Sequence, residues 1–232
     1  MAQPPDITEN FVREVDESLR RDRARDFLNK YGNWLIAGVV LFLGISGGLI
    51  WWNQHQVQKR GEQVEQLAQV YKDIGGGNIA KVGPELDALS DSGSKAIRAS
   101  AKFTQAAVAL QQNDTKQAAA TYKEIAGDSG MPAPYRNVAL VRQTALEFDQ
   151  LRPDEVISRL APLTKSGEPW FGSAGEMTAL ALLKQGKQQQ AAQLFVAIAK
   201  DKTAPDAIRG RAAQVAGSLG VDIAAELQPQ AQ

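Results

Sequence analysis

The sequence contains no cysteine and only one histidine, His55, in 232 residues. The lack of cysteine excludes thiolate nucleophiles, zinc and iron–sulfur sites built on sulfur, and disulfide bridges. His55 has no second histidine that could join it in binding a metal ion. It also has no candidate nucleophile beside it with which to form a catalytic triad. These shortages exclude the common catalytic constellations and leave the cellular compartment open.

Net charge is also lacking, because 26 basic residues balance 26 acidic ones. No global field therefore favours nucleic acid, and we predict no nucleic-acid partner. Gly75-Gly76-Gly77-Asn78 has no preceding strand and no following Gly-Lys-Ser/Thr, so it predicts a connector between helices and not a phosphate-binding loop. The scattered carboxylates are ordinary surface charge. We expect a protein that is not an enzyme, with no catalytic residue, metal or cofactor.

What the sequence does contain is one long apolar run, WLIAGVVLFLGISGGLIWW, over residues 34–52. Its 19 residues are long enough to cross a bilayer as a helix, and no charged residue lies between Lys30 and Lys59. Trp34, Trp51 and Trp52 stand at its ends, where indoles favour the headgroup region. A buried core helix would normally carry a polar stripe, and a cleaved signal would end in small residues. We predict an uncleaved transmembrane helix.

Basic residues are unequally distributed around this helix. Five precede it closely and two follow it: Arg20, Arg21, Arg23, Arg25 and Lys30, against Lys59 and Arg60. The positive-inside rule counts Lys and Arg alone, so the acidic residues in the same stretch carry little weight. We predict a cytoplasmic N-terminus. Gly44 and Gly48 have the spacing of a helix-pairing face, which indicates lateral contact with another membrane helix. The alternative is that they have no pairing role, because glycine is common in membrane helices.

Residues 1–33 form the predicted cytoplasmic segment. Within it Ile7, Phe11, Val15 and Leu19 recur every four residues, which predicts an amphipathic helix over residues 7–29. This helix could bind a partner or the anionic inner leaflet, or serve as a solvated topology signal.

Residues 53–222 are predicted to be a repeat domain, followed by a disordered tail over 223–232. A shift of 73 residues aligns QQNDTKQAAATYKEIA at 111–126 with KQGKQQQAAQLFVAIA at 184–199. Four apolar triads share a spacing of four and then three residues, and start 36, 38 and 35 residues apart: Val82-Leu86-Leu89, Ala118-Tyr122-Ile125, Val156-Leu160-Leu163 and Ala191-Phe195-Ile198. Such periodicity indicates four helical hairpins, with one face of each second helix buried.

The period, the triads, the turn residues Asn113 and Gly186, and the small residues Ala106 and Ala179 resemble the tetratricopeptide repeat. The tryptophan and tyrosine of that consensus are missing and the prolines fall late, so the repeats are divergent. The resemblance implies an all-α fold in which one N-terminal transmembrane helix precedes a right-handed superhelical α-solenoid of about four hairpins.

The whole layout, with the Trp-Trp-Asn-x-His exit from the membrane, resembles the YfgM-like ancillary subunits of the bacterial Sec translocon. This resemblance implies a single-pass protein of the bacterial inner membrane with a periplasmic repeat domain that assists Sec-dependent export and chaperone hand-off. It implies as partners the translocon subunits, a membrane-anchored prolyl isomerase of the PpiD type and exported clients. A structural scaffold for a cell-envelope complex is the alternative.

Mapped through the repeat, five apolar residues of the first helices would line a binding groove: Phe103, Leu110, Val141, Phe148 and Leu183. The competing interpretation is that they pack against neighbouring helices or against a capping helix near residues 206–218.

Overall fold

The structure is a computed structural model that describes residues 7–227, without the side chains of residues 7–29, 31, 32, 35 and 227. Helix is the only regular structure in this range. The chain divides into two compact units, Met1–Gly61 and Glu62–Gln232. Helix α1 (Ile7–Gly75) makes up the first unit and provides the first helix of the second. The predicted all-α fold is confirmed, whereas the amphipathic face predicted for residues 7–29 lies outside the described side chains.

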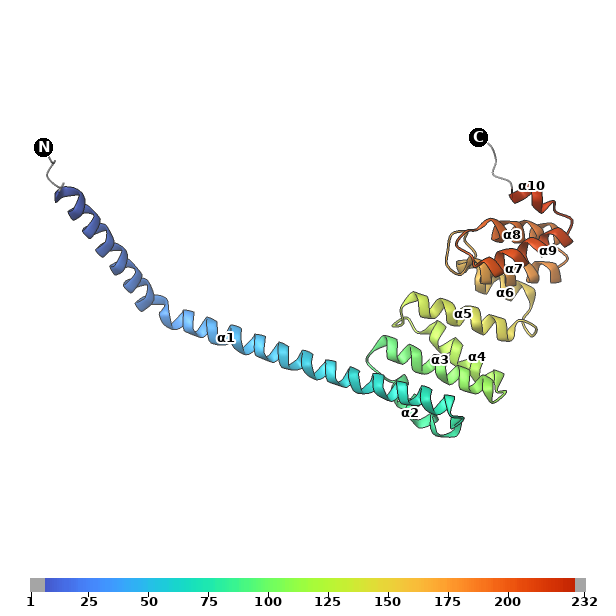
Figure 1. The fold of residues 1–232 in the computed structure, drawn as a ribbon, viewed down its shortest axis with the longest axis horizontal. Helices are drawn as coiled ribbons and strands as arrows, with labels where there is room; N and C mark the ends of the chain where they lie inside the picture. The colour runs from blue at the N-terminus through green and yellow to red at the C-terminus, as the bar shows by residue number, and fades with distance from the viewer. Residues whose placement is uncertain (1–6, 228–232) are drawn as a thin grey trace. The chain divides into compact units, whose positions relative to one another are not determined.

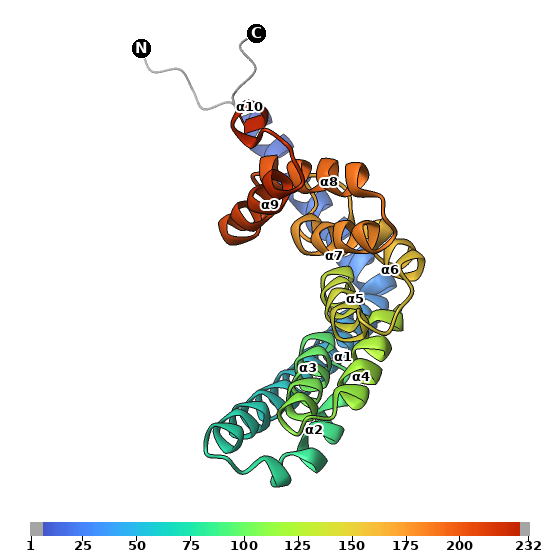
Figure 2. The same cartoon turned by 90° about the vertical axis from the view of Figure 1, so that its right-hand side faces the viewer.

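The second unit is a succession of short helices joined by tight turns (Figure 1). After α1 they are η1 (Ile79–Lys81), α2 (Gly83–Ser90), α3 (Lys95–Gln111), α4 (Thr115–Gly127), α5 (Ala133–Glu147), α6 (Pro153–Leu160), η2 (Ala161–Leu163), α7 (Phe171–Lys184), α8 (Gln188–Lys200), α9 (Asp206–Ser218) and α10 (Ile223–Leu227). Each helix from α2 to α9 contacts the next along the chain (Figure 2). The end of α1 pairs with α2, α3 with α4, α5 with α6, and α7 with α8, which gives the four predicted hairpins.

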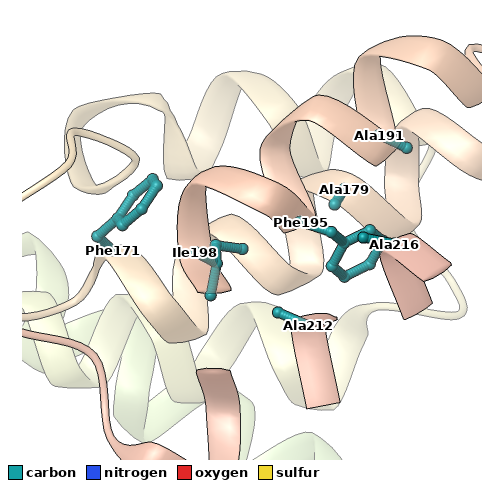
Figure 3. Packing of buried hydrophobic residues seen from close by; sticks show 7 residues of the cluster. All are labelled: Phe171, Ala179, Ala191, Phe195, Ile198, Ala212 and Ala216. Carbon is teal, nitrogen blue, oxygen red and sulfur yellow. The ribbon is translucent and has the colours of Figure 1, made fainter. Parts of the chain in front are cut away.

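The four apolar triads form the buried face of these hairpins, as predicted. All twelve side chains are buried, and none is more than 6% exposed. They belong to four separate clusters, one for each hairpin, as expected for repeats that contact only their neighbours. Figure 3 shows the last cluster, in which the ring of Phe195 lies beside Ala216 of α9.

The third triad departs from a single helix because α6 ends at Leu160. Pro162 lacks the backbone N–H that the next helical turn needs, so the chain tightens into η2. Leu163 therefore lies in η2 while its side chain stays buried.

Three of the four first helices of the hairpins, and α9, share one C-terminal motif. A residue with positive φ closes α1, α3, α7 and α9: Gly77 (φ 80°), Asn113 (61°), Gly186 (75°) and Gly220 (91°). In each case the next backbone N–H donates to the carbonyl five residues earlier, for example Asp114 N to Ala109 O at 2.8 Å and Lys187 N to Leu182 O at 3.0 Å. Helix α5 is the exception, because Glu147 occupies the equivalent place and the chain continues through a further turn to Gln150.

The C-terminal segment differs from the prediction of a disordered tail over 223–232. Residues 223–227 form α10, because Asp222 Oδ1 accepts from Ala225 N at 3.2 Å and Ile223 packs against the cluster around Phe195. Residues 228–232 lie outside the described residues. Helix α9 lies where the competing interpretation of the groove placed a capping helix, near 206–218, and Arg211 Nε donates to Glu176 Oε1 of α7 at 2.6 Å.

Candidate functional site

The first unit presents an apolar helical surface to its surroundings. Within the described part of the chain, one helix is long and apolar enough to cross a membrane, and none of its most apolar window is buried. Trp34 is 79% exposed, and Trp51 and Trp52 are also largely exposed. A soluble core helix would bury such side chains, so this surface fits single-pass anchoring in a lipid environment.

The glycines of this helix leave one open face. A Cβ atom added at Gly44, Gly47 or Gly48 would meet no other atom within 4 Å. The structure therefore leaves room for close approach of another helix at Gly44 and Gly48. Whether a partner helix lies there stays a prediction.

The single histidine lies one turn beyond the apolar run. His55 stacks on Trp51, with ring centroids 5.8 Å apart and planes 2° from parallel. No group of three or more His, Cys, Asp or Glu residues able to hold a metal occurs among the residues that the structure describes. His55 accordingly has an aromatic neighbour from its own helix.

The five residues predicted to line a groove are all half-buried, and the structure distributes them over three clusters. Phe103 and Leu110 of α3 pack against the cluster of Tyr122, and Val141 and Phe148 pack against that of Leu160. Leu183 of α7 packs against the cluster of Phe195. Each of them thus packs against the core of its own hairpin, and whether they line a common groove stays a prediction.

Two of these aromatic rings already have partners within the domain. Phe103 lies 6.0 Å from the ring of Tyr122. Lys184 Nζ stands 4.3 Å above the Phe148 ring and 3.1 Å from Asp149 Oδ1, which joins the ends of α5 and α7. Leu180 of α7, 39% exposed, is the large apolar side chain of this helix that remains open.

Two pockets were missed by reasoning from the sequence. One, of about 260 Å³, lies between α4 and the end of α5 and is lined by Thr115, Lys116, Ala119, Ala120, Lys123, Leu146, Glu147 and Gln150. The other, of about 330 Å³, lies on α8 and is lined by Gln189, Ala192, Gln193, Val196, Val221 and Glu226. The 73-residue shift superimposes the α4 residues on the α8 residues, so the repeat itself was the signal that could have indicated them.

The sequence also gave no sign of a buried carboxylate at the end of α8. Asp201 accepts from Thr203 Oγ1 at 2.6 Å, Gly167 N at 2.7 Å, Thr203 N at 2.8 Å and Ser166 Oγ at 3.0 Å. The hydrogen bonds from Thr203 Oγ1 and Gly167 N hold the pKa of the Asp201 carboxyl well below its usual range. Asp201 thus links two connections by hydrogen bonds: the one that contains Ser166 and Gly167, before α7, and the one that contains Thr203, before α9.

The comparisons with known proteins agree with this architecture. Residues 25–215 match the family model of the tetratricopeptide repeat-like domain, from before the apolar run through most of α9. Comparison with curated proteins and with solved structures found no match. Since the family match covers most of the sequence, the chain belongs to the tetratricopeptide repeat-like domain family.

Proposed function

We propose that this protein is a membrane-anchored interaction module that assists Sec-dependent protein export and chaperone hand-off from the periplasmic side of the bacterial inner membrane. The observation that carries the proposal is the joining, in one chain, of an exposed apolar helix and a stack of tetratricopeptide-like hairpins. Such stacks typically serve protein–protein interaction and not catalysis.

The proposed layout has a cytoplasmic segment over residues 1–33, a membrane helix over 34–52 and a periplasmic domain from residue 53. It is supported by the excess of Arg and Lys before the apolar run. Anchoring has a physical advantage, because confinement beside a channel raises the effective concentration of a weak binding surface.

The proposed partners are translocon subunits, a PpiD-type prolyl isomerase and exported clients. They come from the sequence resemblance stated above, and the family match supports protein partners in general. Clients would contact the apolar side chains of the first helices, with Leu180 as the most open of them on α7.

Protease treatment of spheroplasts tests the orientation. We expect externally added protease to degrade residues 62–227, and to do so without detergent. A cytoplasmic marker protein in the same cells must stay intact as the control. Complete protection of the domain would show that the export role is wrong.

Photo-crosslinking of the full chain in membranes tests the partners. A benzoylphenylalanine replacing Leu180, on the open side of α7, is compared with one replacing Ala207, which is exposed on α9. We expect channel subunits and several nascent exported chains to crosslink at position 180 and not at position 207.

The alternative is a scaffold for one cell-envelope complex, without client binding. One observation favours it: Phe103 and Phe148 are engaged within their own domain, which reduces the free apolar area of the groove. A single crosslinked envelope partner, with no nascent chains, would favour the scaffold.

A further inference from the structure

The pockets on α4 and α8 occupy the same place in two repeats. Lys116, Ala119, Ala120 and Lys123 correspond, at the shift of 73 residues, to Gln189, Ala192, Gln193 and Val196. None of the lining residues is among the five predicted for the groove. The surface therefore belongs to the second helices of the hairpins and is separate from the one considered above.

The pocket on α8 has one wall that comes from a later segment of the same chain. Gly220, with φ 91°, ends α9, and Val221 and Glu226 form one wall of the pocket. Val221 packs against the cluster of Phe195, and the Glu226 carboxylate accepts from Lys200 Nζ. A short segment with an apolar residue and, five positions on, a carboxylate thus lies against the α8 surface.

The α4 pocket has no such segment. Glu147 stands where α9 has Gly220, and after α5 ends there the chain makes a further turn to Gln150. Phe148, which corresponds to Val221, then packs against the cluster of Leu160 and not against α4. On the side facing α4, the pocket is lined by Leu146, Glu147 and Gln150.

The lining of the α4 pocket is more positively charged than that of the α8 pocket. Lys116 and Lys123 replace Gln189 and Val196, both lysines are exposed, and neither has an ion-pair partner among the side chains that the structure describes. The one carboxylate of the lining, Glu147, is paired with Arg159 and accepts from Gln143 Nε2 at 3.2 Å. The lining thus combines the apolar side chains of Ala119 and Leu146 with the two lysines.

We propose that the α4 pocket binds a short acidic segment of a partner protein, with one apolar side chain on Ala119 and Leu146 and carboxylates on Lys116 and Lys123. Charge complementarity with Lys116 and Lys123 carries the inference. The α8 repeat is a precedent for the apolar contact alone, because its Glu226 is held by Lys200, whose counterpart in the α4 repeat is Gly127. It goes beyond the proposed function and does not depend on the membrane orientation.

Fluorescence anisotropy with the full chain in detergent micelles tests this proposal. The probe is a labelled, end-capped peptide copying residues 219–227, LGVDIAAEL. We expect saturable binding that Lys116→Glu with Lys123→Glu weakens at least about tenfold, because two attractive contacts become repulsive. A probe with Asp222→Asn and Glu226→Gln should lose a similar factor.

The matched control is Lys81→Glu with Lys95→Glu, which changes the net charge equally at exposed lysines outside the pocket. We expect this control to bind the probe within about twofold of the natural chain. Absence of saturable binding, or an equal loss in both double variants, would overturn the proposal. If the Lys116 and Lys123 changes instead abolish self-association of the chain, the occupant is a second copy and the assignment to a partner is wrong.

Discussion

At the scale of single residues, the Asp201 carboxylate accepts backbone hydrogen bonds that helical carbonyl groups accept elsewhere in the fold. Its carboxylate satisfies two backbone N–H groups and two hydroxyl groups in connections that lack helical hydrogen bonds. Asp128 stands at the equivalent place after α4 and accepts from Gly130 N at 2.8 Å. The same turn chemistry thus recurs in two repeats, but only Asp201 is buried.

Asp201→Asn should lower the free energy of unfolding at pH 7 by about 2 kcal/mol, because a neutral amide accepts more weakly and places an NH2 group among donors. Denaturant unfolding measures the change. Asp91→Asn, at an exposed helix end, is the control and should stay within about 0.5 kcal/mol. Equal losses in the two variants would contradict the role assigned to Asp201.

The difference in unfolding free energy between the natural chain and Asp201→Asn should become smaller as the pH falls. Because the native pKa of Asp201 is lowered, its contribution is complete above the ordinary aspartate pKa of about 3.9 and is lost as the pH falls below that value toward the native pKa. The stability difference between the natural chain and Asp201→Asn should therefore narrow by about 1 kcal/mol between pH 7 and pH 3. A constant difference would show that the carboxylate charge is not involved.

The residues with positive φ give a second test at this scale. Gly186→Ala should cost about 1 kcal/mol of unfolding free energy, because it adds a β-carbon at φ 75°. Asn113→Ala should cost a similar amount, because alanine tolerates a φ of 61° less well than asparagine. Asn113→Gly should stay within about 0.5 kcal/mol of the natural chain, since asparagine tolerates this conformation. Gly127→Ala, at a helix end with open space and no positive φ, serves as the unstrained control.

At the scale of helices, α7 approaches its neighbours through glycine. A Cβ atom at Gly175 would lie 3.0 Å from Ile198 Cδ1, and one at Gly172 would lie 3.1 Å from the Ala204 Cβ. Gly175→Val should therefore destabilise the domain by about 1–3 kcal/mol through overpacking. Gly210→Ala in α9, where space is open, should stabilise it by up to about 1 kcal/mol through helix propensity. Thermal unfolding should move in opposite directions in the two variants.

The helices and their buried faces could be predicted because both depend on local pattern. Spacing alone placed Ala118, Tyr122 and Ile125 on one buried face, and the turns at Asn113 and Gly186 were visible as breaks in the same pattern. The end of α6 was not foreseen, although Pro162 was visible, because the buried position of Leu163 kept the triad regular.

The candidate surfaces were harder to predict, because they depend on contacts between distant helices. Spacing put Phe148 on the inner side of α5 but could not show that Lys184, in another hairpin, covers its ring. Predicting the pockets would have required a comparison of Glu147, at the end of α5, with Gly220, at the end of α9. After Gly220 the chain covers part of α8, whereas after Glu147 it leads away from α4.

At the scale of the whole molecule, the proposed function depends on which side of the membrane the repeat domain lies. Four arginines provide most of the basic excess before the apolar run: Arg20, Arg21, Arg23 and Arg25. Within about 15 residues of the run, replacing all four with glutamine leaves Lys30 before it against Lys59 and Arg60 after it, so the local bias reverses; Arg13 lies farther away.

We expect this quadruple variant to lose its single orientation, so that a substantial fraction of the domain becomes protected from external protease in spheroplasts. The matched control neutralises the acidic residues of the same segment: Asp16, Glu17, Asp22 and Asp26. That control should keep the natural orientation, because acidic residues contribute little to topology. If protection were unchanged in the arginine variant, the basic residues would not set the orientation, and another determinant, such as the folding of the repeat domain, would have to fix it.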